Sequence, residues 1–317
     1  MTYVVKRLLI TLPVLFIVSV LVFSLIHLIP GDPAQVILGQ DATPATLQAL
    51  RVQLGLNQPL LLQYWHWIGS VLHGNLGKSL LDGTPVTKLI AQRLPVTLEL
   101  AIGTFLVSLL IAFPLGILAA VYRGKVGDAV ALFSSSIGLS VPPFWLGIIL
   151  LLVFTVKVHW FPSSGYVPIW QNVGQNLWSM ALPIVATGVR EAAVLMRMLR
   201  SSLLDVLHQD FVRTARAKGL AGWAVIVRHA LKNALIPVIT TGGLQLAGLL
   251  GGLVITESVF SLPGFGNLLV QSILSRDYTT VQGAALVFAL LVIVVNVLVD
   301  LVYGMADPRI HLGKEAA

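Results

Sequence analysis

Long apolar runs separated by short polar segments dominate the pattern of hydrophobic and polar positions along the chain. A helix needs roughly 20 apolar residues to cross the hydrocarbon core of a bilayer. Runs of this kind cover residues 8–28, 96–121, 129–156, 236–256 and 281–303, and another begins near residue 177. The pattern therefore predicts an all-α polytopic membrane protein with six transmembrane helices.

Prolines interrupt this pattern at two places. The sequence Pro30-Gly31-Asp32-Pro33 ends the first run, because proline fixes its backbone angle and lacks an N–H donor. No small-residue cleavage site precedes Pro30, and the apolar core is longer than that of a signal peptide, so we expect the first helix to be retained. Pro142 and Pro143 lie inside the third run, and that helix is expected to be kinked or broken.

A mixed stretch separates the first two runs and predicts an extracytoplasmic helical segment at 30–94. Within it, Tyr64, Trp65 and Trp67 are expected to lie at the membrane interface, where aromatic rings with one polar edge are favoured. The chain thus divides into an N-terminal tail with the first helix, the extracytoplasmic segment, a five-helix transport domain and a C-terminal tail. These parts cover residues 1–29, 30–94, 95–310 and 311–317.

The distribution of positive charge predicts the orientation of the chain. The N-terminus, the loop at Arg123, the region from Arg190 to Lys232 and the C-terminus hold 14 of the 20 Lys and Arg residues. Positively charged residues accumulate in loops on the cytoplasmic side. Both termini and a loop at 203–233 are therefore expected to be cytoplasmic, as six spans require.

Composition excludes several classes of protein. Hydrophobic residues make up 56% of the chain and charged residues 10%, which is typical of a membrane protein. The net charge of +7 does not indicate a nucleic-acid partner, because the positive residues flank apolar runs and set orientation. The chain has no Cys, so disulfides and thiolate metal sites are unavailable.

A phosphate-binding loop is nearly matched at residues 74–79 but fails at one position. The motif requires a glycine five residues before Gly77, and Leu72 stands there. The backbone cradle for phosphates is therefore lost. If ATP drives this protein, another chain binds it.

The basic stretch from Gln209 to Pro237 lies between two apolar runs. If Asp210 caps a short helix, then Arg213, Arg216 and Lys218 fall on or near one side of it. Gly219 would end that helix, because a left-handed closing residue is most easily a glycine. Two interpretations of this stretch remain open: a loop that only sets orientation, and a docking element.

Ala215, Gly219 and the spacing from Arg213 to Leu231 resemble the cytoplasmic coupling loop of permease subunits of bacterial ATP-binding-cassette (ABC) importers. The run 210–219, followed by 228–237, resembles the dipeptide, oligopeptide and nickel branch of that family. Similar phrases occur at 28–33, 257–266 and 307–309. The resemblance covers nearly the whole chain.

The chain departs from the family pattern at the start of this loop. The pattern begins Glu-Ala-Ala, whereas this chain has Arg213-Thr214-Ala215, which removes a carboxylate from the docking surface. Lys232 stands where many members have Pro. The segment 191–193 reads Glu-Ala-Ala but is a decoy, because Arg197 occupies the place where Gly should follow.

The resemblance implies the type I importer permease fold, with cytoplasmic termini, in the bacterial inner membrane. It implies half of a translocation channel for dipeptides or oligopeptides, with nickel chelates, glutathione or another small solute as alternatives. Its implied partners are a second permease, two subunits that bind ATP and Mg²⁺, and an extracytoplasmic substrate-binding protein. The residues implied to couple with the ATPase are Asp210, Arg213, Thr214, Ala215, Arg216, Lys218, Gly219 and Leu220.

Polar residues within the apolar runs are candidates for the translocation pathway. They are Ser136, Ser140, Arg190, Glu191, Thr241 and Gln245. Small hydroxyls also help membrane helices to pack closely, so packing is an alternative role for the serines and Thr241. Charges at membrane depth need a partner or water, and Arg190 is expected either to meet a carboxylate such as Asp300 or to lie in a wet vestibule.

The sequence argues against two other classes of function. A self-sufficient secondary transporter would use Arg190, Glu191 and Asp300 as an ion relay, but no internal repeat is visible in the sequence, as such transporters commonly have. An intramembrane enzyme would need a motif such as His-Glu-x-x-His or Gly-x-Ser-x-Gly. Neither motif occurs in the sequence, and a transport subunit without catalytic residues is expected.

Overall fold

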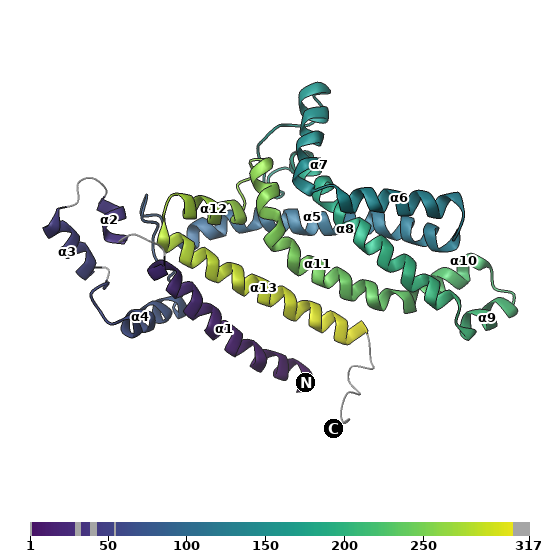
Figure 1. The fold of residues 1–317 in the computed structure, drawn as a ribbon, viewed down its shortest axis with the longest axis horizontal. Coiled ribbons are helices and arrows are strands. Elements are labelled where there is room, and N and C mark those ends of the chain that lie inside the picture. Colours follow the sequence, from purple (N-terminus) through teal and green to yellow (C-terminus); the bar gives the residue numbers. More distant parts are fainter. Residues whose placement is uncertain (1, 29–32, 39–42, 54, 307–317) are drawn as a thin grey trace. The chain divides into compact units, whose positions relative to one another are not determined.

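The computed structural model describes residues 2–28, 33–38, 43–53 and 55–306, and it divides into two compact units. Unit 1 contains residues 1–95 and 264–294, and unit 2 contains residues 96–263 and 295–317. Two of the three divisions fall inside long helices, α5 (Val86–Val121) and α13 (Tyr278–Ala306), and the third falls just before α12 (Phe265–Leu274). Figure 1 shows the helical architecture.

Unit 1 begins with α1 (Thr2–Leu28), α2 (Pro33–Leu38), α3 (Pro44–Gln53) and α4 (Leu60–Leu72). Tyr64 fastens α4 to α1, because its hydroxyl lies 2.8 Å from Ser19 Oγ and its ring meets Phe23 edge-on at 5.4 Å. Only 7% of Tyr64 is exposed, whereas Trp65 is 60% exposed. Tyr64 therefore packs inside the protein, on the face of α4 that contacts α1. The place of these rings at the membrane interface stays a prediction.

The rest of unit 1 is built around the start of α5, α12 (Phe265–Leu274) and the start of α13. Their core consists of Val86, Ile90, Phe265 and Ala284. Asp277, 3% exposed, binds the loop before α5, with its carboxylate accepting hydrogen bonds from Ser79 Oγ (2.6 Å) and Leu80 N (3.0 Å). The same carboxylate accepts the Thr280 hydroxyl at 2.7 Å, so one buried acid both starts α13 and anchors that loop.

Unit 2 is organised around α8 (Val173–Leu207), the most buried of its long apolar helices. α8 lies beside α6 (Val126–Ser140), α7 (Pro143–Leu150) and α11 (Leu231–Val259) (Figure 1). Its contact with α6 is close, since a Cβ on Gly138 would lie 3.2 Å from Ala193 Cβ. Small residues at such crossings let membrane helices approach each other.

The third apolar run is broken rather than gently kinked. α6 ends at Ser140, and α7 continues after Pro142 as a helix that passes into a π-helical segment, η2 (Leu151–Lys157). The two parts differ in direction by 97°. This confirms the effect of the proline pair, because proline supplies no N–H donor and restricts the residue before it.

Two buried polar contacts join the long helices of unit 2. Thr97 of α5 donates its hydroxyl to the carboxylate of Glu257 on α11, which is completely buried. Thr187 of α8 and Thr256 of α11 are joined through their hydroxyls at 3.2 Å. In a bilayer such groups have no water to bind, so these contacts favour one alignment of the three helices.

Among the described residues, four helices are long and apolar enough to cross a membrane, or five if the broken pair counts as one span. α5 starts earlier than the span expected from Val96, because Val86 and Ile90 already pack in the core of unit 1. The family-like phrases at 28–33 and 307–309 fall largely outside the described residues.

Candidate functional site

A short helix, α9 (Asp210–Ala217), follows the end of α8 and presents one apolar side to the protein. Val212 is fully buried and Ala215 is 7% exposed. Residues three apart lie on the same face of a helix, so these two side chains pack α9 against the rest of the protein. They pack in a cluster with Ala120, Leu203, Val206, Val225, Ala230 and Ala234.

The end of α9 is a Schellman turn closed by Gly219. Gly219 has φ +79°, its N–H donates to the Arg216 carbonyl at 2.9 Å, and the Leu220 N–H reaches the Ala215 carbonyl at 3.4 Å. These are the two bonds that characterise this motif. The left-handed closing residue expected from the sequence is therefore confirmed.

The start of α9 differs from the expectation. Gln209 is the N-cap, with φ −76° and ψ 152°, and no side chain caps the helix. Asp210 instead lies in the first turn, where its carboxylate complements the positive end of the helix dipole. Its Oδ1 is 3.5 Å from Arg213 Nη1, and both side chains are largely exposed, at 95% and 75%, so this ion pair adds little stability.

The outer side of α9 is cationic and accessible. Arg213, Thr214, Arg216, Lys218 and Leu220 are all exposed. Large apolar side chains accompany the charges, and sequence reasoning gave them no role: Phe211 is 39% exposed and Trp223 is 66% exposed. Exposed aromatic rings among basic groups are typical of a surface that binds another protein.

The chain returns from α9 through α10 (Gly222–Ala224) and a π-helical segment, η3 (Val225–Ala230), into α11. η3 contacts both α9 and α8. The Ser202 hydroxyl of α8 donates to the Ala234 carbonyl of α11 at 2.9 Å. Displacement of α9 would therefore act on two long helices at once.

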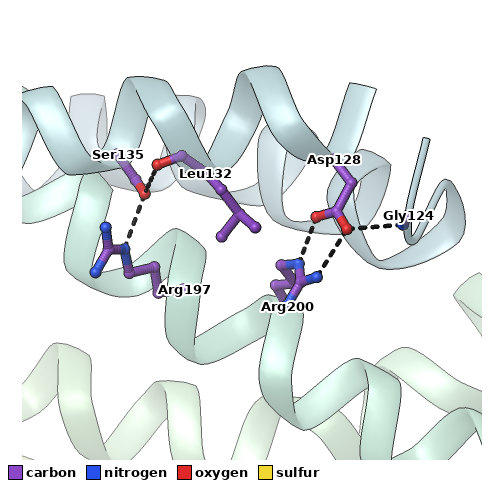
Figure 2. A network of polar contacts seen from close by, with 6 residues as sticks. All are labelled: Gly124, Asp128, Leu132, Ser135, Arg197 and Arg200. Atoms are coloured by element: carbon purple, nitrogen blue, oxygen red, sulfur yellow. Dashed lines mark hydrogen bonds and ion pairs between the residues drawn. The ribbon is translucent and has the colours of Figure 1, made fainter. Parts of the chain in front are cut away.

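A series of polar contacts, called here the polar ladder, joins Asp128, Ser135 and Ser136 of α6 to Arg197 and Arg200 of α8. Figure 2 shows most of these residues. Arg200 Nε and Nη2 donate to the two carboxylate oxygens of Asp128 at 2.7 and 2.8 Å, and Gly124 N donates to Oδ2 at 2.9 Å. The side chains of Arg200 and Asp128 are 20% and 7% exposed. Sequence reasoning missed Asp128, whose only signal was an acid just after the positive loop that contains Arg123.

The other contacts of the polar ladder are hydrogen bonds from Arg197 to serine hydroxyls. Arg197 Nε donates to Ser135 Oγ at 2.9 Å, and its Nη2 donates to Ser136 Oγ at 2.7 Å. The structure thus joins a pathway candidate, Ser136, to an arginine near the end of α8. Because Arg197 and Arg200 are fork-shaped donors, they can bind two acceptors each.

The structure places the six pathway candidates on α6, α8 and α11. Ser136, Ser140 and Arg190 are exposed, whereas Glu191, Thr241 and Gln245 are half-buried. Ser136 and Ser140 share a face of α6, since residues four apart are neighbours. Gln245 and Glu191 also lie together, because Gln245 Nε2 donates a hydrogen bond to the backbone carbonyl of Glu191 at 3.2 Å.

Several of these polar groups are satisfied within their own helices. The Ser140 hydroxyl donates to the Ser136 carbonyl at 2.8 Å, and the Thr241 hydroxyl donates to the Pro237 carbonyl at 2.9 Å. Among the described residues, Arg190 forms no ion pair within 4 Å; the side chain of Asp300, its expected partner, lies outside them. Arg190 thus lies on the surface of this subunit.

Comparison with known proteins identifies related sequences. Residues 112–312 match the family described as binding-protein-dependent transport system inner membrane component, and residues 1–101 match the corresponding N-terminal family. A protein of Brucella suis biovar 1, provisionally named a peptide transport system permease, is 43% identical over 306 residues, covering 96% of this chain and 98% of that protein. The glutathione transport system permease protein GsiC of Escherichia coli O6:H1 is 43% identical over 311 residues, covering 98% and 99%.

The fold also resembles solved structures. A chain of the MetNI methionine ABC transporter in an inward-facing conformation has a TM-score of 0.56 at 19% identity, covering 69% of this chain and 96% of its own. A chain of an amino acid ABC transporter crystallised with histidines has a TM-score of 0.51 at 16% identity, covering 69% and 94%. At these identities the likeness concerns the fold.

The ladder generates a prediction about stability. Replacing Arg200 with Gln should leave the Asp128 carboxylate without its charged donors, at a cost of about 2 kcal/mol. The double variant Asp128→Asn with Arg200→Gln should recover part of this loss, because neither charge is then left unpaired. Thermal unfolding of the purified protein in detergent measures both, with the exposed Arg213→Gln as the matched control; equal midpoints for Arg200→Gln and Arg213→Gln would refute the ladder's contribution.

Proposed function

Because this chain belongs to the family of binding-protein-dependent transport system inner membrane components, we propose that it forms half of a peptide translocation channel. It is an inner-membrane permease subunit of an ABC importer, which is a transport component rather than an enzyme. Members of this class work with ATPase and substrate-binding partners. The composition that we propose here is a second permease, two ATP-binding subunits and an extracytoplasmic binding protein.

Six spans with both termini in the cytoplasm are the proposed topology. Four long helices and the broken α6–α7 pair supply five candidate spans among the described residues. The sixth is α1, whose 27 residues would extend about 40 Å at 1.5 Å per residue. The positive charges at both termini and in the loops at Arg123 and α9 support this orientation.

The geometry of α9 is the observation that carries the proposed role in coupling. Its inner face is fixed by Val212 and Ala215, and its closing turn at Gly219 directs the chain back into η3 and α11. The outer face then meets a groove of an ATPase subunit. The proposed contact set is that of the sequence analysis: Asp210, Arg213, Thr214, Ala215, Arg216, Lys218, Gly219 and Leu220, with buried Ala215 positioning the others.

The proposed translocation pathway follows the polar residues of α6, α8 and α11. Exposed Ser136, Ser140 and Arg190 lie on the surface of the subunit, where the second permease would enclose them. Glu191, Thr241 and Gln245 lie deeper and are supported by contacts within and between helices. An exposed Arg190 favours the wet vestibule over a buried ion pair.

Peptides are the substrate class that we propose, with glutathione as the second candidate because of the relative named for glutathione transport. Glutathione is itself a small anionic peptide, so the two differ in size and charge rather than in chemical class. A nickel chelate or another small solute is the remaining alternative from the sequence. ATP and Mg²⁺ are assigned to the partner ATPase subunits, and no cofactor is assigned to this chain.

Reconstitution tests the proposed function. In proteoliposomes that contain the whole complex and a loaded binding protein, uptake of a labelled peptide should require ATP and the ATPase subunits. Dipeptides, a longer peptide, glutathione and a nickel chelate, assayed in parallel, identify the substrate class. Uptake driven by a proton or sodium gradient without the ATPases would instead support a secondary transporter.

A matched pair of glycine variants tests the coupling role of α9. A Cβ at Gly219 meets no atom within 4 Å but must adopt φ +79°, so Gly219→Val strains the backbone by roughly 1 kcal/mol and misdirects η3. Gly222 has equally open surroundings without a positive φ, which makes Gly222→Val the control. We expect Gly219→Val to insert and hydrolyse ATP with at least several-fold less uptake; unchanged uptake per ATP would contradict the proposal.

Cysteine labelling tests the pathway, because the chain has no native Cys. Single cysteines at Ser136, Ser140, Thr241 and Gln245 should react with a water-soluble thiol reagent in at least one nucleotide state of the complex. Ser108→Cys is the matched control, since Ser108 is completely buried and should remain unlabelled. Protection of all four test positions in every state would reject the pathway.

A further inference from the structure

A cavity of about 280 Å³ lies beside α9, where α5 and α8 end. Its walls come from the last turn and following loop of α5 and, much later in the chain, from the last turns of α8, from α9 and from η3. The lining residues are Ala120, Val121, Arg123, Leu204, Leu207, His208, Arg216 and Ile226.

Positive charge collects among the residues that line this cavity. Arg123 and Arg216 supply two guanidinium groups, and none of the described residues that line the walls is Asp or Glu. Asp128 interacts with Arg123 electrostatically but forms its ion pair with Arg200, and Asp210 faces Arg213. Asp205, in the last turn of α8, is exposed and does not line the cavity. Among the described residues, neither Arg123 nor Arg216 forms an ion pair within 4 Å.

The remaining walls are mainly apolar. Ala120 and Val121 are the last residues of α5, and Leu204 and Leu207 belong to the last turns of α8. His208 Nδ1 lies 2.6 Å from the Leu204 carbonyl oxygen, so this nitrogen must carry the proton that it donates. The cavity therefore combines a cationic rim with a surface suited to hydrocarbon.

We propose that this cavity binds the phosphate headgroup of an anionic phospholipid from the cytoplasmic leaflet. Two guanidiniums match the geometry of a phosphate, and basic pockets between membrane helices on the cytoplasmic side suit such headgroups. Arg123 lies two residues beyond the end of α5, so on the proposed topology it lies at headgroup depth while the acyl chains face the apolar walls.

This arrangement would tie the coupling helix to the membrane. Arg123 belongs to the loop after α5, whereas Arg216 belongs to α9. A phosphate between them offsets the repulsion of two like charges and joins α9 to the end of a span. The inference rests on the proposed topology and adds a regulatory lipid to the proposed coupling site.

A carboxylate of an ATPase subunit is the competing occupant. The apolar walls favour the lipid, because an acidic loop of a soluble protein would bury its polar backbone against Ala120, Leu204 and Ile226 without hydrogen-bond partners. Arg213 and Lys218 do not line the cavity and remain available to the ATPase, whereas Arg216 of the proposed contact set is assigned here to the lipid instead.

Native mass spectrometry of the purified whole complex, supplemented with phosphatidylglycerol, measures lipid retention directly. Arg123→Gln should weaken retention about tenfold, because one charged donor to the phosphate is lost. Lys125→Gln is the matched control: the loop and the charge change are the same, but Lys125 lies over the Tyr122 ring and outside the cavity. Its retention should equal that of the unmodified complex.

A second pair, Arg216→Gln against Arg213→Gln, repeats the comparison on α9. Equal loss in the members of either pair would overturn the site, since diffuse surface charge would then explain retention. Full displacement of the lipid by millimolar inorganic phosphate would assign the cavity to free phosphate. If Arg123→Gln retained the lipid but lost the ATPase subunits, the cavity would be assigned to the ATPase. Either result overturns the lipid proposal.

The lipid proposal and the proposed function can be refuted independently of each other. Mass spectrometry needs no ATP turnover, so a complex that imports peptide with ATP but shows no selective retention refutes only the lipid. A complex that retains phosphatidylglycerol selectively but takes up peptide without ATPases refutes only the proposed function.

Discussion

The burial of Val212 and Ala215 is the contact on which the proposed coupling depends. An eight-residue helix is too short to be stable alone in water, so α9 exists because one face is packed against the ends of α8, η3 and α11. That packing also determines which side chains face outward. Because α9 packs against the ends of the long helices α8 and α11, a force applied to α9 acts on those two helices.

The polar ladder between α6 and α8 satisfies the hydrogen-bond donors of two arginines on an apolar helix. Arginines near the end of an apolar helix are costly unless their donors are satisfied. Asp128 balances the charge of Arg200, while Ser135 and Ser136 provide neutral acceptors for Arg197. Charge is thus matched where one guanidinium is most covered, and Arg190 is left at the surface, where water or a passing substrate can reach it.

Permease subunits of ABC importers carry no chemistry of their own, and this chain fits that division of labour. Its polar groups either hold helices in register, as Thr97 and Glu257 do, or line surfaces on which another molecule would act. The cavity at Arg123 and Arg216 belongs to the second kind. A lipid there would make the bilayer a participant in coupling rather than only a solvent for the spans.

The sequence by itself determined the elements of this protein. Apolar length identified the long helices, the proline pair identified the break after α6, and Gly219 identified the end of α9, because each of these effects is local to the backbone. The resemblance in the loop at 210–219 identified the family before any contact was known. The six-span count and the orientation remain sequence-based predictions.

Only the tertiary structure decided which side chains meet. Asp128 and Arg200 are 72 positions apart, and no periodicity in either helix indicates that they pair. The same holds for Tyr64, whose burial against α1 is not indicated by any local pattern in α4. The capping role expected of Asp210 was also wrong, because the helix begins one residue earlier, with Gln209 as its N-cap. Contacts between distant segments depend on how helices cross, and crossing geometry arises from the whole packed set of side chains rather than from any one stretch.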